Sequence, residues 1–179
     1  MKQTSTPKSS VKESQNSDSN SIAKLREMTD GIKYVMLTTI DEEGSLFSRP
    51  MTVQELDDSG VFWFFTGRTT GQVSEIKKDQ HINLSFALPK DSRFVSVSGV
   101  AEVINDIHKA KELWSPLLKA FFPQGLEDPN LTLLKVTPVS AEYWDSPSAT
   151  VVKILGAAKA VLKGEAYEGG ENEKLHFTH

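Results

Sequence analysis

The sequence contains no cysteine among its 179 residues, and this absence excludes several kinds of chemistry at once. Disulfide bonds, thiolate-ligated zinc, iron–sulfur clusters and cysteine nucleophiles all require a thiol. The four histidines form no pair at metal-ligand spacing, since His81 and His108 lie far apart and His176 and His179 stand near the end of the chain. We therefore expect no metal site.

Basic excess and long apolar runs are also missing. The formal net charge is −4, whereas general nucleic-acid binders gather a basic excess on one face, so we expect no nucleic-acid partner. No apolar run approaches the roughly 20 residues that span a membrane. Residues 1–20 lack the apolar stretch of a secretory signal. Together these absences favour a cytoplasmic protein with no membrane partner.

Common catalytic fingerprints are absent as well. The patterns GxGxxG, GxxxxGK[ST], GxSxG and HExxH do not occur. No pair of side chains stands out as a committed acid and base. Any function must therefore be inferred from less common features.

The composition indicates one folded domain between two polar ends. Residues 1–20 carry six serines, and Met1 and Val11 are their only large apolar side chains. Such a segment buries too little surface to offset the entropy of ordering it, so we expect a disordered tail. The polar residues 165–179 are expected to form a flexible tail. One domain of ordinary size is then predicted over residues 21–164.

Strand signals dominate this domain. Three strand-like runs separated by short Asp/Gly turns predict an antiparallel meander: IKYVMLTTI (32–40), SLFSRPMTVQEL (45–56) and VFWFFTG (61–67). Three further runs bring the total to about six: HINLSFAL (81–88), RFVSVSGVAEVI (93–104) and LTLLKVTPVSAEYW (131–144). Gly99 lies inside one of them and suggests a bulge or sharp bend, such as a small barrel needs at its corners.

Helical patterns are few. We expect a short helix that is capped by Asn20 or Ser21, has Ile22, Leu25 and Met28 on its apolar side, and ends at Gly31. Others are predicted within residues 69–79 and, capped by Asp106, within 106–122. Residues 151–162 are ambiguous and favour a strand that runs into a short helix. The pattern predicts a mainly β (α+β) fold, a six-stranded antiparallel split β-barrel with flanking helices.

The segment FFTGRTTGQVSEIKKD (64–79) contains the most groups that could bind a ligand. A strand ends at Phe65 and Thr66, a short turn follows, and a helix starts near Thr70. The exposed amides of the first helical turn, with nearby threonine hydroxyls, would form an anion seat to which Arg68 and Arg49 could add charge. The alternative is purely structural, because threonines cap helices and glycine turns join strands to helices.

Two further features suggest a ligand. Pro50, in SRPMT (48–52), has no backbone N–H to donate to a neighbouring strand, so it belongs at a sheet edge or a bulge. Backbone groups that are not bonded to a neighbouring strand there can face a ligand. Arg49 beside it is either part of such a site or a solvated surface charge. Trp144 stands at a strand end, where a flat ring could be covered, whereas Trp63 and Trp114 are better explained as core or dimer contacts.

In this order, these elements resemble the flavin-binding split-barrel family of the pyridoxamine 5′-phosphate oxidases, and in particular its bacterial general stress proteins. The resemblance rests on SRPM (48–51), FWFFTGRTTGQVSEIKKDQHINLSF (62–86), VSVSGVAEV (95–103), ELWSPLLKAFFPQGLEDPN (112–130) and AEYWD (141–145). It implies a homodimer of split barrels with two FMN molecules at the interface.

The resemblance also implies roles for individual residues. Those matched to flavin-contacting positions are Arg49, Pro50, Met51 and Thr52 on one strand, Phe65 and Thr66 on the next, Thr70, Gly71 and Gln72 at the phosphate grip, and Trp144 reaching the flavin from the partner subunit. Gly71 and Gln72 replace the arginine and lysine of a Ser-Arg-Lys grip, so two cations are missing. Helix-start amides, Thr70, Arg49 and Arg68 would then hold the phosphate, with weaker binding expected.

The resemblance favours a flavin-dependent oxidoreductase of the general stress type with an unidentified substrate. Residues 145–156 contain no arginine or histidine to hold a substrate phosphate, so vitamin B6 synthesis is not expected. Two alternatives remain open. The same barrel could bind a deazaflavin or haem, or the chain could be a non-catalytic flavin-binding or flavin-free stress-response protein that acts through partners.

Overall fold

The structure is a computed structural model that describes residues 8–145 and 171–177. Its α-helices are α1 (Lys8–Thr29), α2 (Gly71–Lys78) and α3 (Ile107–Leu113), and its short 3-10 helices are η1 (Pro89–Asp91), η2 (Pro116–Ala120) and η3 (Gly125–Glu127). Its strands are β1 (Tyr34–Ile40), β2 (Leu46–Thr52), β3 (Glu55–Leu56), β4 (Phe62–Gly67), β5 (His81–Leu88), β6 (Arg93–Ile104), β7 (Leu131–Asp145) and β8 (Glu171–His176). The expected strand-then-helix at residues 151–162 lies outside the described residues.

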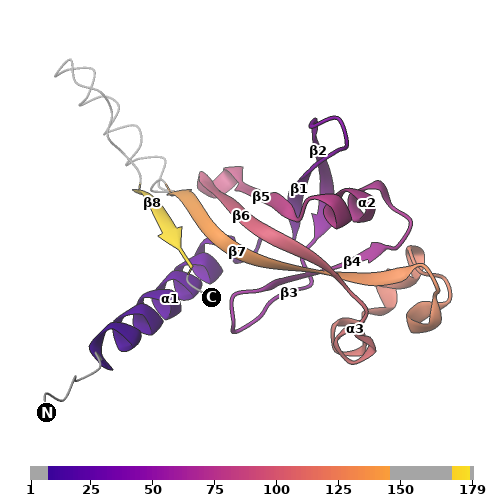
Figure 1. Ribbon diagram of the computed structural model, residues 1–179, viewed down its shortest axis with the longest axis horizontal. Helices are drawn as coiled ribbons and strands as arrows, with labels where there is room; N and C mark the ends of the chain where they lie inside the picture. The colour runs from indigo at the N-terminus through magenta and orange to yellow at the C-terminus, as the bar shows by residue number, and fades with distance from the viewer. Residues whose placement is uncertain (1–7, 146–170, 178–179) are drawn as a thin grey trace, which may run out of the picture.

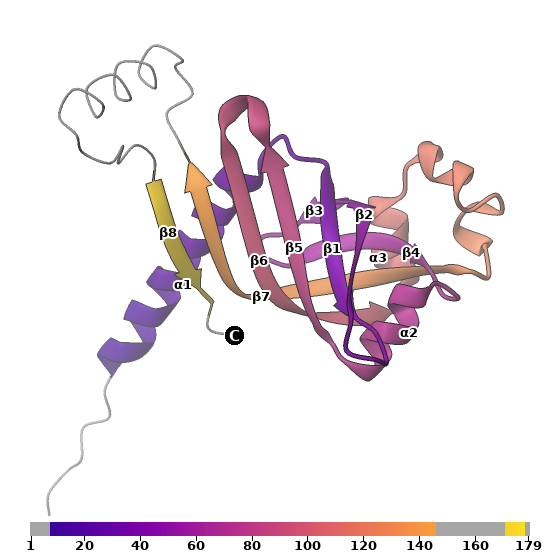
Figure 2. The same ribbon diagram turned by 90° about the horizontal axis from the view of Figure 1, so that it is seen from above.

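The strands form one antiparallel sheet in the order β2-β1-β5-β6-β7-β4-β3. The long strand β7 pairs with β6 on one side, and on the other it pairs first with β4 and then with β8. The sheet curls so that α2 and α3 lie at one end of the molecule and α1 and β8 at the other (Figures 1 and 2). The mainly β split-barrel prediction is confirmed, with eight strands rather than six among the described residues.

The expected meander is confirmed in its two hairpins, since β1 pairs with β2 and the short β3 pairs with β4, but the two hairpins are not neighbours in the sheet. Instead β4 lies beside β7, and β5 takes the other edge of β1. The run 45–56 divides in two because Val53 N donates to Lys33 O, whereas the next amide, of Gln54, donates to Trp63 O. Turn residues set where a strand ends, but they do not decide which distant edge it joins. β2 is an edge strand, as Pro50 requires.

Both ends of the predicted domain carry more regular structure than expected. α1 begins at Lys8, not at a cap near Asn20 or Ser21, so helical backbone runs through part of the segment predicted to be a disordered tail. Its predicted apolar residues Leu25 and Met28 are buried in the core. At the other end, β8 lies within the expected flexible tail, because Leu175 packs into the core while the strand pairs with β7.

The bulge predicted at Gly99 is confirmed. The register of β6 on β7 shifts between Ser98, which lies opposite Ser140, and Gly99, which lies opposite Pro138. A glycine is needed there because a Cβ would approach the Thr137 carbonyl oxygen to 2.6 Å. The bulge lets the two longest strands bend as the sheet curls.

The helix predicted over 106–122 is broken in two. Asp106 caps α3 as expected, since its carboxylate accepts from the amides of His108 and Lys109. α3 ends at Leu113 and η2 begins at Pro116, because a residue before proline is forced into an extended conformation. The segment after α3 packs on β4 and β7 through a second apolar cluster, which includes Phe65, Phe122 and Leu131. None of the described helices is long and apolar enough to cross a membrane.

Candidate functional site

A cleft of about 340 Å³ lies between β2, the end of β4, the turn into α2, and the segment that contains η2. Its lining includes predicted site residues from three separate parts of the chain: Pro50, Met51, Thr52, Phe65, Thr66 and Thr70. The remaining wall comes from Gln54, Gly67, Leu118, Phe121, Phe122 and Asn130. The cleft therefore has apolar walls and a polar end at the start of α2.

The turn from β4 into α2 positions the polar end. β4 ends at Gly67, and the Thr70 amide donates to the Gly67 carbonyl oxygen at 3.2 Å. The Thr70 hydroxyl donates to the same oxygen at 2.8 Å, so it does not cap the helix that follows. The first amides of a helix have no acceptor within the helix. The start of α2 therefore combines uncapped backbone donors with the hydroxyl of Thr66, whereas the Thr70 hydroxyl already donates to Gly67.

Gln72 lies beneath this end and does not face outward. Its side chain is buried, and its Nε2 donates to Thr66 Oγ1 at 2.7 Å and contacts Met51 Sδ at 3.4 Å. The residue thus links β2 to β4 through α2. Where the resemblance implied a phosphate-binding cation, this chain has a structural cross-link.

Arg49 is held by Glu75 of α2. Alternation along β2 places Arg49 and Met51 on the same face, toward the helix. Arg49 Nη1 donates to Glu75 Oε2 at 2.8 Å and Nη2 to Glu75 Oε1 at 2.7 Å, while Thr39 Oγ1 donates to Glu75 Oε2 at 2.5 Å. The side chain of Arg49 is only 28% exposed and that of Glu75 only 13%. Arg49 is therefore neither a core residue nor a solvated surface charge, but half of a partly buried ion pair.

The Arg49–Glu75 ion pair lies close to Gly71, the first residue of α2. A Cβ on Gly71 would lie 3.4 Å from Arg49 Nη2 and 3.4 Å from Glu75 Oε1. Burial alone would raise the pKa of the Glu75 carboxyl, but the hydrogen bonds from Arg49 and Thr39 hold that pKa below its ordinary value of 4.5. Glu75 is therefore a carboxylate at neutral pH, and it cancels the charge of Arg49.

We expect Glu75→Gln to lower the free energy of unfolding at neutral pH by about 1 kcal/mol, the order found for a single ion pair. Because the folded-state pKa lies below the unfolded one, the contribution of the carboxylate is present above that unfolded value and is lost as the pH falls through the folded one. Urea denaturation at several pH values should show the difference from wild type shrinking toward acid pH. A difference that is constant with pH would contradict this account.

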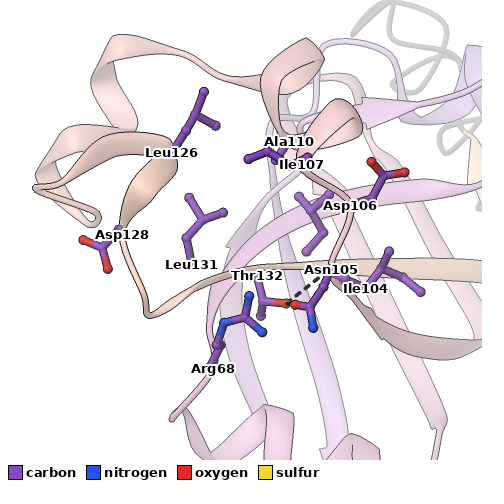
Figure 3. A pocket seen from close by; sticks show the side chains of 11 residues that line it. Arg68, Ile104, Asn105, Asp106, Ile107, Ala110, Leu126, Asp128, Leu131 and Thr132 are labelled. Carbon is purple, nitrogen blue, oxygen red and sulfur yellow. Dashed lines mark hydrogen bonds between the residues drawn. The ribbon is translucent and has the colours of Figure 1, made fainter.

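Arg68 does not join the cleft. It lines a separate hollow of about 140 Å³ together with Asp106 and Asp128. Its Nε donates to the Pro129 carbonyl oxygen at 3.0 Å, and Figure 3 shows its guanidinium on the side of Thr132. The expectation that Arg68 adds charge to the anion seat is wrong, because the turn directs this side chain toward the start of β7.

Trp144 lies far from the cleft along the chain. β7 passes the cleft at Thr132, which pairs with Thr66, and Trp144 stands twelve residues further on, opposite Phe94. That separation corresponds to roughly 40 Å of strand. The indole is 39% exposed. The fold of the single chain therefore does not bring Trp144 together with the other predicted site residues.

Sequence reasoning missed two parts of this site. The wall formed by Leu118, Phe121 and Phe122 lies within residues 106–122, which were predicted as a single helix although the proline at position 116 indicates a break. Glu75 was also missed. Nothing in an amphipathic helix distinguishes one glutamate from another until the fold sets it against Arg49.

Known proteins resemble this chain in sequence and in fold. A family model described as pyridoxamine 5′-phosphate oxidase like matches residues 20–168. Protein bli-3 of Neurospora crassa is 32% identical over 143 residues, which cover 74% of this chain and 68% of that protein.

Two solved structures of bacterial proteins share this fold. One is a Clostridium acetobutylicum protein related to general stress protein 26, with 26% identity, a TM-score of 0.62, and coverage of 72% of this chain and 90% of that one. The other is the general stress FMN/FAD binding protein of Xanthomonas citri, with 28% identity, a TM-score of 0.59, and coverage of 73% and 89%.

Proposed function

Because this chain belongs to the pyridoxamine 5′-phosphate oxidase-like family, we propose that it binds a flavin, FMN, in the cleft between β2, β4, α2 and η2. The observation that carries the proposal is the convergence of Met51, Phe65 and Thr66 on one cleft. The similarity to an FMN/FAD binding general stress protein supports the choice of cofactor. We also propose that the protein acts in the cytoplasm.

The two ends of the cleft fit a flavin differently. Met51, Phe65 and Phe121 give apolar walls for a flat ring, and the Thr66 hydroxyl and the amides at the start of α2 give donors for the polar end of the ligand. A bound flavin would supply redox chemistry, while the protein orients the ring and excludes water from it. We therefore propose a flavin-dependent oxidoreductase of the general stress type, without vitamin B6 synthesis.

We also propose that the protein is a homodimer. A hollow of about 690 Å³ on the outer face of the sheet is lined in part by the apolar side chains of Ile40, Leu46, Ile82, Val100 and Val139. Leu46 and Val139 are exposed in the single chain. Exposed apolar area of this kind suits contact with a second copy. In such a dimer Trp144 of one subunit would reach the flavin of the other.

Flavin titration tests the proposal. Purified apo-protein should quench the fluorescence of added FMN or riboflavin with a micromolar or lower dissociation constant. Failure to bind either flavin would overturn the flavin proposal and favour the flavin-free stress-response alternative. Binding of a deazaflavin or haem instead would keep the cleft but change the cofactor.

Trp144→Ala is expected to weaken flavin binding by about tenfold, because stacking on an aromatic ring contributes roughly 1 kcal/mol or more. The measurement is the same titration, with sedimentation to confirm the oligomeric state. Lys77→Ala is the control, since Lys77 is exposed on α2 and does not line the cleft. A Trp144→Ala dimer that binds flavin like wild type would contradict the proposed role of the partner subunit.

A further inference from the structure

The start of α2 has two arginines nearby, and neither offers a free charge to the cleft. Arg49 is bidentate on Glu75, and Arg68 lines a different hollow beyond the turn (Figure 3). At the positions that the resemblance assigns to cations, Gly71 has no side chain and Gln72 is buried against Thr66. Backbone amides and the hydroxyl of Thr66 are therefore the main donors available to an anion there.

Glu75 adds an opposing charge at the same place. One of its oxygens lies 3.4 Å from the position of a Cβ on Gly71, the first residue of the helix. A phosphate seated on the amides of this helical turn would meet the carboxylate of Glu75 as well as the guanidinium of Arg49. Since the two charges cancel, the pair contributes little net attraction to a dianion.

We infer that Glu75 is a specificity-determining residue, which neutralises Arg49 so that the site reads the ring and ribityl chain of a flavin and largely ignores its phosphate. The inference rests on the proposed function. It assigns to this site the wider class of flavins, with riboflavin bound nearly as well as FMN. In this chain, the glutamate that pairs with Arg49 thus controls how strongly the site prefers FMN over riboflavin.

A charge series at the pair tests the inference. The dissociation constants of FMN and of riboflavin are measured by flavin fluorescence for wild type, Glu75→Gln, Arg49→Gln and the double variant. Glutamine preserves the size of Glu75 and can still hydrogen-bond to Arg49 and Thr39, while removing the negative charge. The pair then carries a net charge of about 0, +1, −1 and 0 across the series.

The preference for FMN over riboflavin should follow that net charge. Wild type should favour FMN by less than about tenfold, and Glu75→Gln should raise the preference by about tenfold or more, the effect of one freed charge-assisted hydrogen bond. Arg49→Gln should lower it, and the double variant should return it close to the wild-type value. The ratio of the two affinities is the readout, because a change in contacts to the ring or ribityl chain alters the binding of both flavins and cancels in the ratio.

Glu42→Gln is the matched control. Glu42 also forms an ion pair with a partner on or near α2, in this case Lys78 at the far end of the helix. Its replacement makes the same change in total charge without touching Arg49. The ratio of FMN to riboflavin affinity should therefore stay at the wild-type value.

Two outcomes would overturn the inference while leaving the flavin proposal intact. One is a wild-type preference for FMN above about a hundredfold, the scale of a working phosphate grip. The other is a shift of both flavins by the same factor in Glu75→Gln and Arg49→Gln, which would indicate a general change in the cleft. If wild type binds neither flavin, the proposed function fails, and the inference fails with it.

Discussion

Gly99→Ala is expected to lower the free energy of unfolding by about 3 kcal/mol, at the upper end of the cost of overpacking a closely packed site. The added Cβ would lie 2.6 Å from the carbonyl oxygen of Thr137 and 3.3 Å from its carbonyl carbon. Both atoms belong to the backbone of β7, which is hydrogen-bonded to β6 and cannot turn aside as a flexible side chain would. The substitution should therefore strain the bulge between the two longest strands.

Urea denaturation of wild type, Gly99→Ala and Ser98→Ala would measure this effect. Ser98 is the preceding residue of β6 and is exposed, so its replacement should change stability by less than about 0.5 kcal/mol. Equal stability of the two variants would mean that the bulge rearranges without cost. The comparison separates the close approach at Gly99 from any general sensitivity of this strand.

Phe65→Ala is expected to cost about 3–4 kcal/mol of stability and to abolish measurable flavin binding. The ring is 8% exposed, and it packs edge-on against Trp114 at a centroid distance of 5.9 Å and against Phe122 at 6.4 Å. It is the residue at which β4, the segment after α3, and the cleft meet. Its removal would leave a cavity in the second apolar cluster and loosen one wall of the cleft.

Phe121→Ala is the matched control for this prediction. Phe121 lines the same cleft, but its ring is 77% exposed, so the change in stability should be below about 0.5 kcal/mol. Phe65→Leu should recover most of the lost stability, because it refills much of the cavity. Equal destabilisation by Phe65→Ala and Phe121→Ala would show that the cluster does not depend on the buried ring.

Local patterns predicted many of the elements correctly. The helix cap at Asp106 follows from a carboxylate and the amides of His108 and Lys109 shortly after it, and the bulge at Gly99 follows from a glycine within an alternating strand. The edge position of β2 follows from Pro50, which has no amide to donate. In each case the physical cause lies within a few residues, so a single sequence is enough to reveal it.

Predictions that depended on distant neighbours fared worse. The run 45–56 looked like one strand, but its two halves join different partners, and this depends on the amides of Val53 and Gln54 finding acceptors elsewhere in the chain. β8 looked like a polar tail, because only Leu175 and Phe177 turn inward, and their burial requires the free edge of β7. Whether a strand pairs with a distant strand of the sheet is hardly visible in the residues of that strand alone.

The sequence by itself determined a cysteine-free chain with a mainly β domain, the positions of most strands, and the family that the ordered motifs resemble, since these depend on composition and on short-range periodicity. Only the tertiary structure decided how the site is charged. Arg49 and Glu75 come from different elements, and closure of the sheet against α2 brings them to 2.7 Å. The same closure directs Arg68 to another hollow and buries Gln72, because the packing around the turn from β4 into α2 sets the direction of the side chains there.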